Sequence, residues 1–300
     1  MSFSSEAKKE IAAALPDKIC CRAAQAYGML ECGHAFSDQE ISLQTEQEVI
    51  ADTYARLISR VVGIRRPERQ ETTRRGARHR CSIDDPAQRV QVLERFGHSP
   101  REVSVRLNRA NLECEGCARA YLRGAFLVCG AVTDPEHDYH LEFSLPHYNL
   151  SRDLMTLLRE VDFPAKVTTR GSAYIVYIKG SERIEDCLTY LGATRASLEL
   201  MGVKMVKSIR NDTNRRINCE SANIDKTVQA AGTQMDALQK IEKTCGLTAL
   251  PEELQAVAQL RLEHPEMSLR DLGAAMEPPL SRSGVNHRLQ RIIKFAEGLK

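Results

Sequence analysis

The sequence lacks an apolar run long enough to span a membrane, and its opening, MSFSSEAKKEIAAAL, lacks the uninterrupted apolar core of a signal peptide. It also lacks a large charge of either sign, because the formal net charge is only +2. A surface for nucleic acid would therefore have to come from local clusters of basic residues. Without a secretion signal, the ten cysteines are typical of reduced thiols. We expect a cytoplasmic protein with no membrane partner that is long enough for two domains.

An internal duplication is visible in the N-terminal part of the chain. The segments CRAAQAYGMLECGHAF (21–36) and CARAYLRGAFLVCGAV (117–132) each place a glycine, Gly28 or Gly124, inside an apolar helical pattern. A glycine within a helix costs about 1 kcal/mol relative to alanine, so it needs a packing reason. We expect two helices to cross closely at these glycines, with no side chain between their backbones.

The segments that follow the two glycine helices also match in order. Each copy is predicted to continue with two strands, an amphipathic helix, two further strands and a closing helix that ends in glycine, with one strand of each pair matched between the copies. The first copy places the matched elements at 41–45, 52–63, 80–85 and 88–97, and the second at 141–145, 151–162, 174–180 and 182–192. Repeats at about 21–97 and 117–192 predict one duplicated α+β domain over 21–210, with a separate N-terminal helix within 1–20.

Residues 211–247 are predicted to form a linker with one long helix from Ser221 to Cys245. Its apolar residues fall three and four apart and form a seam: Ile224, Val228, Ala231, Met235, Leu238 and Ile241. The seam either packs on one of the domains or mediates self-association.

Residues 248–300 have the pattern of an all-α helix-turn-helix domain. A first amphipathic helix spans 250–265, and Ser268 followed by Asp271 is typical of a capping box at the start of a second helix. The second helix is ended by Pro278 and Pro279. The EPPLSRSG connection that follows is longer than the usual turn of this motif.

The third helix of this domain, capped by Ser281 or Ser283, carries the candidate site. Its buried side is predicted to hold Val285, Leu289, Ile292 and Ala296, while polar and basic residues face outward. Arginine can bind guanine, asparagine can bind adenine, and lysine can neutralise phosphate. We therefore predict base contacts by Arg282, Asn286, His287, Arg288 and Arg291, and backbone contacts by Ser268, Arg270, Ser281, Ser283 and Lys294. The alternative is a helical bundle with a solvated polar side.

The paired glycine helices and their sheets resemble the LAGLIDADG fold of homing endonucleases, in which two helices pair and two sheets form a saddle for DNA. In active members of that family, the eighth motif position of each helix is an acidic metal ligand. Here the two positions hold Gly33 and Cys129. Glycine offers no ligand, and a soft thiolate suits magnesium badly. Glu31 lies two positions earlier, but its counterpart is Leu127. We therefore expect no catalytic residue, no catalytic metal and no cofactor.

Several longer stretches are similar to the WhiA family of sporulation and cell-division transcription factors in Gram-positive bacteria. They are MSFSSEAKKEI, YLRGAFLVCGAVTDPEHDYHLEF, NCESANIDKT and LRLEHPEMSLRDLGAAMEPPLSRSGVNHRLQRI. The resemblance implies a non-enzymatic regulator that binds double-stranded promoter DNA of division, sporulation or chromosome-segregation genes. The nucleoid would then be its place in the cell. The first repeat, YGMLECGH, departs from the family motif. The alternatives are a divalent-metal-dependent DNA endonuclease and a scaffold that binds a protein partner through the LAGLIDADG-like domain.

Two further features each have two interpretations. Residues 65–80 carry seven arginines and two glutamates, and form either a phosphate-binding loop or a solvated segment. Cys20, Cys21, Cys114 and Cys117 precede the two glycine helices at equivalent places, and the last two have the spacing of zinc ligands. They are either a metal site or partly buried reduced thiols.

Overall fold

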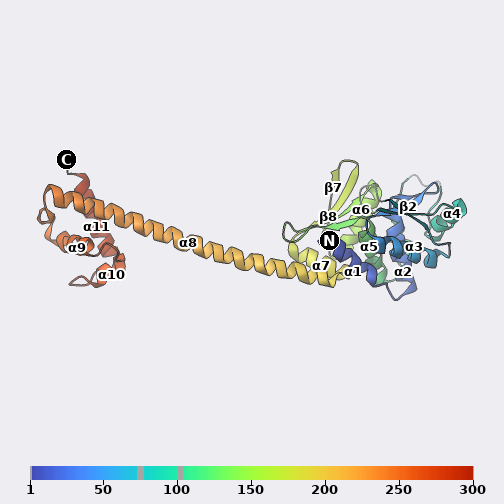
Figure 1. Ribbon diagram of the computed structural model, residues 1–300, viewed down its shortest axis with the longest axis horizontal. Helices are drawn as coiled ribbons and strands as arrows, with labels where there is room; N and C mark the ends of the chain where they lie inside the picture. Colours follow the sequence, from blue (N-terminus) through green and yellow to red (C-terminus); the bar gives the residue numbers. More distant parts are fainter. Residues whose placement is uncertain (1, 73–77, 101–103, 300) are drawn as a thin grey trace. The chain divides into compact units, whose positions relative to one another are not determined.

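The computed structural model describes residues 2–72, 78–100 and 104–299, which form two compact units, 1–207 and 208–300. The first unit is a duplicated α+β domain (Figure 1). After α1 (Phe3–Ala13), its first copy contains α2 (Ile19–Glu31), β1 (Ala35–Phe36), β2 (Ile41–Thr45), α3 (Glu48–Val62), β3 (Glu68–Thr72), β4 (Arg78–Ser82) and α4 (Pro86–Arg95). A 3-10 turn at Arg109–Asn111 leads to the second copy, which contains α5 (Glu115–Cys129), β5 (Gly130–Val132), β6 (His140–Leu145), α6 (Tyr148–Glu160), β7 (Lys166–Arg170), β8 (Ala173–Lys179) and α7 (Ser181–Leu191).

The two copies build the same antiparallel sheet. The strand order is β1-β2-β4-β3 in one and β5-β6-β8-β7 in the other, which confirms the predicted duplication. The predicted strand at 80–85 is displaced, because β4 starts at Arg78 and ends at Ser82. Its pairing with β2 runs from His79, opposite Thr45, to Ser82, opposite Ser42, and its pairing with β3 extends it to Arg78. Both closing helices are followed by a glycine with positive φ, Gly97 at 72° and Gly192 at 93°, as a left-handed helix end requires.

The helices α2 and α5 cross at the two predicted glycines. A Cβ atom at Gly28 would overlap the carbonyl oxygen of Tyr121, and one at Gly124 would overlap that of Gln25. The backbones touch where any larger residue would separate them, so the predicted close crossing is confirmed. Around it lie the large buried side chains of both copies, among them Tyr27, Tyr121 and Phe126.

The long helix α8 runs from Thr194 to Thr244, so the prediction that it begins at Ser221 is wrong. Its polar stretch, KSIRNDTNRRINCES, has no apolar period, but it contains no proline and nothing else in it ends a helix. The boundary between the two units falls inside this helix, between Lys207 and Ser208. None of the described helices combines the length and the apolarity that a membrane crossing requires.

The apolar seam predicted on α8 packs only at its C-terminal end. Leu238 and Ile241 are fully buried, whereas Ile224 and Val228 are 61% and 63% exposed. The expectation that the whole seam packs on a domain is therefore wrong for its N-terminal part.

The second unit is all α-helical. The end of α8 and the 3-10 turn Leu247–Ala249 pack with α9 (Glu252–Glu263), α10 (Leu269–Ala274) and α11 (Arg282–Glu297) (Figure 1). The side of α11 that was predicted to be buried faces this core, with Val285, Leu289, Ile292 and Ala296 all less than 4% exposed. The packing fixes which side chains of α11 remain at the surface.

Candidate nucleic-acid interface

Serine caps set the start of both helices that carry the candidate site. The hydroxyl of Ser268 accepts a hydrogen bond from the Asp271 amide at 3.3 Å, which is the N-cap bond of the predicted capping box, and it donates one to the Asp271 carboxylate at 2.7 Å. At α11 the cap is Ser281, whose hydroxyl accepts from the Gly284 amide at 3.2 Å and lies 3.0 Å from the Ser283 hydroxyl. These hydroxyls already serve the helix ends, so their first role is to fix the helices.

The connection between α10 and α11 is held close to α10 by a glycine. Leu280 donates its amide hydrogen to the Gly273 carbonyl at 2.9 Å. A Cβ atom at Gly273 would overlap the Leu280 carbonyl, so a larger residue would push the connection away. The peptide bond between Glu277 and Pro278 is cis. The connection is long in sequence, but its contact with Gly273 keeps its end against α10 just before α11 begins.

The predicted contact residues are spread over three sides of α11. Each residue turns an α-helix by about 100°, so the buried row of Val285, Leu289 and Ile292 fixes the direction of the others. Arg282 and Asn286 lie on one flank. Opposite the core lie the exposed residues Ser283, His287, Gln290 and Lys294. Arg288 and Arg291 lie on the other flank, toward α9.

The first flank borders a basic hollow of about 470 Å³. Its lining includes four of the predicted residues and, from α8, Lys226 and Thr227 among others; the four are Ser268, Arg270, Arg282 and Asn286. We call it the basic hollow. Gln234 and Arg261 also line it, and both are only 2% exposed. Arg261 donates to the Gln234 side chain at 3.0 Å and to the Met267 carbonyl at 2.5 Å.

The lining of the basic hollow includes four cationic side chains and no carboxylate. Among the described residues, none accepts a hydrogen bond from the guanidinium groups of Arg270, Arg282 or Arg288. Clustered cations with unused donors are what a nucleic-acid backbone requires. The structure therefore brings Ser268, Arg270, Arg282 and Asn286 together as one surface.

Arg291 is placed differently, because it is engaged by an acid. It donates to Glu253 of α9 at 2.5 Å, and both side chains are partly exposed. An exposed ion pair of this kind contributes about 0–1 kcal/mol, so it can open, but its carboxylate opposes an approaching phosphate.

The contribution of α8 to this surface was not predicted from the sequence. Lys226, Ala230 and Gln234 fall four residues apart and share one face of the helix, which is a detectable signal. The segment was predicted to be a linker on the strength of its apolar seam, and the polar face beside that seam received no role. The buried pair of Gln234 and Arg261 has no local signal, because its two residues come from different helices.

The two positions that hold acidic metal ligands in a LAGLIDADG nuclease are occupied here by Gly33 and Cys129. A Cβ atom at Gly33 would lie 3.0 Å from the carbonyl oxygens of Leu30 and Ser42, so even a small side chain would be crowded. Cys129 lies beside Cys32, and their hydrogen bond, together with burial, raises the pKa of the Cys32 thiol well above its usual range. Sulfur is in any case a soft ligand that suits hard magnesium badly.

The nearby carboxylate of Glu31 is used inside the core. It is 2% exposed and accepts hydrogen bonds from the hydroxyls of Tyr27 at 3.0 Å and Tyr121 at 2.6 Å. Its oxygens are turned into the protein rather than toward a substrate.

The arginine-rich segment lies partly outside the described residues, since 73–77 include Arg74 and Arg75. Four of the five described arginines of the segment are paired with acids, Arg65 being the exception, although the pair of Arg78 with Glu46 is long at 4.0 Å. Arg66 pairs with Asp52, Arg69 with Glu48 at 3.0 Å, and Arg80 with Glu40 at 2.9 Å. These pairs reduce the positive charge that this surface could offer to phosphate.

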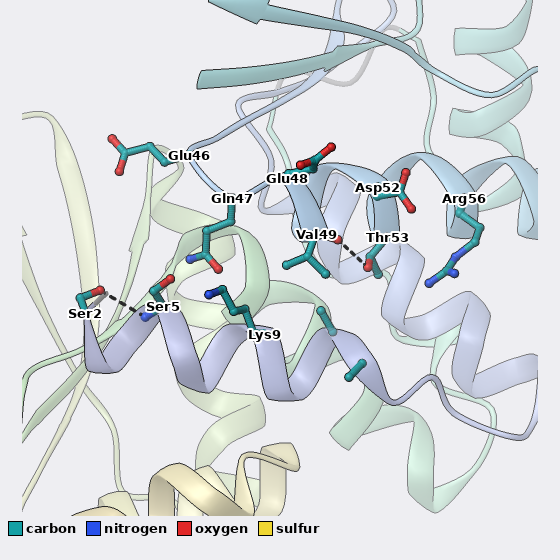
Figure 2. A pocket seen from close by; sticks show the side chains of 12 residues that line it. Ser2, Ser5, Lys9, Glu46, Gln47, Glu48, Val49, Asp52, Thr53 and Arg56 are labelled. Carbon is teal, nitrogen blue, oxygen red and sulfur yellow. Dashed lines mark hydrogen bonds between the residues drawn. The ribbon is translucent and has the colours of Figure 1, made fainter. Parts of the chain in front are cut away.

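A polar groove of about 1160 Å³ lies between α1 and α3 (Figure 2). Lys9 and Ser5 of α1 point toward Gln47 and Val49 on the other side, and Asp52 and Arg56 continue the wall. Its lining mixes three acids, Glu46, Glu48 and Asp52, with two bases, Lys9 and Arg56. Neither a phosphate nor a divalent cation is favoured in such a groove.

The fold and the site together define a class: a LAGLIDADG-like domain joined to a helix-turn-helix domain. A family model described as the WhiA C-terminal HTH domain matches residues 213–296, and one described as the WhiA LAGLIDADG-like domain matches residues 118–210. The first repeat lies outside this second match, in keeping with its altered motif, although its sheet has the same topology.

Proteins named "Probable cell division protein WhiA" match over the full length. The one from Alkaliphilus oremlandii is 35% identical over 315 residues, which cover 100% of this chain and 98% of that relative. The one from Caldicellulosiruptor bescii is 34% identical over 312 residues, covering 100% and 96%. A relative from Clostridium botulinum is 46% identical over 189 residues, but this match spans only 63% of the chain and 60% of that relative's length. The chain belongs to the WhiA family.

Solved structures agree with the fold. The crystal structure of full-length WhiA from Thermotoga maritima has a TM-score of 0.62 at 22% identity and covers 100% of this chain and 99% of its own. The crystal structure of the N-terminal LAGLIDADG domain of WhiA has a TM-score of 0.51 at 17% identity and covers 64% and 92%.

Proposed function

We propose that this chain is a sequence-specific, DNA-binding transcription regulator of division, chromosome-segregation or sporulation genes. Its place in the cell is then the cytoplasm, on the nucleoid. The observation that carries the proposal is the basic hollow, where donors from α8, α10 and α11 stand side by side and the lining contains no carboxylate. The cell-division context comes from the names of the relatives.

In the proposed complex, the N-terminal half of α11 enters the major groove. Arg282, Asn286 and His287 contact base edges, with Arg288 and Arg291 at the far flank as further base contacts. Arg270, Lys294 and the capping serines Ser268, Ser281 and Ser283 lie along the DNA backbone, joined by Lys226 from α8. Arg282 and Asn286 share the flank of the basic hollow with Arg270, so we assign them the main part of the recognition.

Genome-wide crosslinking of the full chain tests the proposal directly. We expect a limited set of enriched promoters near division, segregation or sporulation genes, with a shared motif that the purified protein binds. A protein-binding scaffold would enrich no sites. That outcome would overturn the proposed function.

Arg291 is expected to matter less than Arg282, because Glu253 already engages it. We predict that Arg291→Ala weakens binding to an enriched site by less than about threefold, whereas Arg282→Ala weakens it by about tenfold or more. Fluorescence anisotropy with a labelled duplex measures both. Equal losses for the two variants would mean that Arg291 leaves Glu253 and contacts bases fully.

We further propose that the LAGLIDADG-like domain does not cleave DNA, since Gly33 and Cys129 replace the carboxylates that would hold magnesium. Plasmid containing an enriched site, incubated with the protein and Mg²⁺ or Mn²⁺, should stay supercoiled. Gly33→Asp with Cys129→Asp serves as a companion variant, showing whether carboxylates alone restore activity. Site-specific nicking by the unaltered chain would show that other residues bind the metal.

A further inference from the structure

Four cysteine thiols converge where the N-terminal ends of α2 and α5 meet. The sulfur of Cys114 lies 3.6 Å from those of Cys20 and Cys21 and 3.5 Å from that of Cys117. The sulfurs of Cys21 and Cys117 are 4.0 Å apart, and all four lie within 4.8 Å of one another. Each repeat supplies two of the four.

These separations match the edges of a tetrahedron around a single metal ion. Zinc–thiolate bonds of about 2.3 Å place the four sulfurs of a tetrahedral site about 3.8 Å apart. A cluster of several iron atoms would hold its four thiolates farther from one another, because each binds a different metal or a different corner of the cluster. The four thiols therefore suit one ion.

The surroundings are shaped to the sulfurs. Cys21 is 6% exposed and Cys117 is fully buried, while Cys20 and Cys114 are half-buried. Gly116 stands between the ligands of the Cys-x-x-Cys loop, where a Cβ atom would press on the Cys21 sulfur at 3.2 Å. The Cys117 amide donates to the Cys114 carbonyl at 2.8 Å and fixes the loop.

The electrostatics favour thiolates at this place. Cys114 caps α5, and Cys20 and Cys21 lie in the first turn of α2, so two helix N-termini face the sulfurs. Four thiolates on one divalent ion would leave an excess negative charge. Nearby cations can offset this charge, because a hollow beside Cys21 is lined by Lys18, Arg119 and Arg123 and by only one acid, Asp17.

We propose that Cys20, Cys21, Cys114 and Cys117 bind one Zn²⁺ ion, which joins the N-terminal ends of the two central helices. All four ligands come from the protein, so no position is open to substrate and the site is structural. Soft thiolates select zinc over magnesium or calcium. The sequence alone left this interpretation beside that of reduced thiols, and the convergence of the sulfurs decides between them. The proposal is independent of DNA binding.

Metal analysis of the untagged full chain, purified under reducing conditions from zinc-supplemented cells, tests this inference. We expect about one zinc per chain. Cys20→Ser combined with Cys114→Ser should lower the content at least about tenfold. The matched control, Cys219→Ser combined with Cys245→Ser, changes two exposed cysteines elsewhere and should keep it.

A second measurement covers the case in which the double variant does not fold. Unaltered protein, stripped of metal and titrated with Co²⁺, should develop the intense visible absorption of a tetrahedral tetrathiolate site at about one equivalent. Removal of the metal should lower the melting temperature of the LAGLIDADG-like domain by about 10 °C. A zinc-free protein that takes up no cobalt would overturn the proposal. So would a disulfide between these cysteines in cells, an iron–sulfur cluster, or zinc content equal in both double variants.

Discussion

Replacing both Arg270 and Arg282 with alanine is expected to weaken binding to an enriched promoter site by about two to three orders of magnitude. Both guanidinium groups border the basic hollow, and no described residue accepts a hydrogen bond from either. A direct arginine contact to a base is worth about 1–3 kcal/mol, and a phosphate contact adds a smaller term that depends on salt. The loss should appear as a higher Kd in anisotropy titrations at several salt concentrations.

The salt dependence separates the two roles. If Arg270 contacts a phosphate, Arg270→Ala should reduce the slope of log K against log salt by about one and weaken all sequences alike. If Arg282 contacts a base, Arg282→Ala should mainly reduce the preference for the specific site. Lys243→Ala is the matched control, because Lys243 is an exposed cation of α8 outside the hollow lining. Unchanged affinity and slope in the double variant would remove the basic hollow from the DNA-binding surface.

Local patterns predicted the helices of this domain well. The N-cap at Ser268 and the buried row of α11 depend only on residues three or four apart, and both are present in the structure. Contacts between elements left no such signal. The pairing of Arg291 with Glu253 and that of Arg261 with Gln234 arise from how α8, α9 and α11 pack.

In the duplicated domain, too, local patterns could be predicted from the sequence, whereas the distances between elements could not. The order of its elements and the crossing at Gly28 and Gly124 could be predicted, because glycine inside an apolar helix is costly unless another backbone approaches closely there. The distances among the four thiols could not be predicted from the sequence, since they depend on the angle and offset at which α2 and α5 meet. The length of α8 was missed because its middle carries no apolar period, although nothing there ends the helix.

The second prediction with a large effect concerns the helix crossing: Gly124→Ala is expected to lower the free energy of unfolding. The added Cβ would overlap the Gln25 carbonyl and approach the Met29 amide nitrogen at 3.0 Å, and both are backbone atoms that cannot rotate away. Overpacking of this kind costs about 1–3 kcal/mol or more, and here the helices must separate. We expect a loss near the upper end, about 3 kcal/mol, which lowers the melting temperature of the LAGLIDADG-like domain by about 10 °C in calorimetry of the full chain.

Gly202→Ala tests the same change where space is open. Gly202 is also helical and belongs to the same unit, but an added Cβ would meet nothing within 4 Å. Alanine favours a helix over glycine by about 1 kcal/mol, so this variant should be unchanged or slightly more stable. Since the two substitutions alter helix propensity alike, the difference between them isolates the contact between α2 and α5. If both variants melted at the same temperature, the two backbones would not be in contact at Gly124, and the close crossing that brings the four cysteines together would be wrong as well.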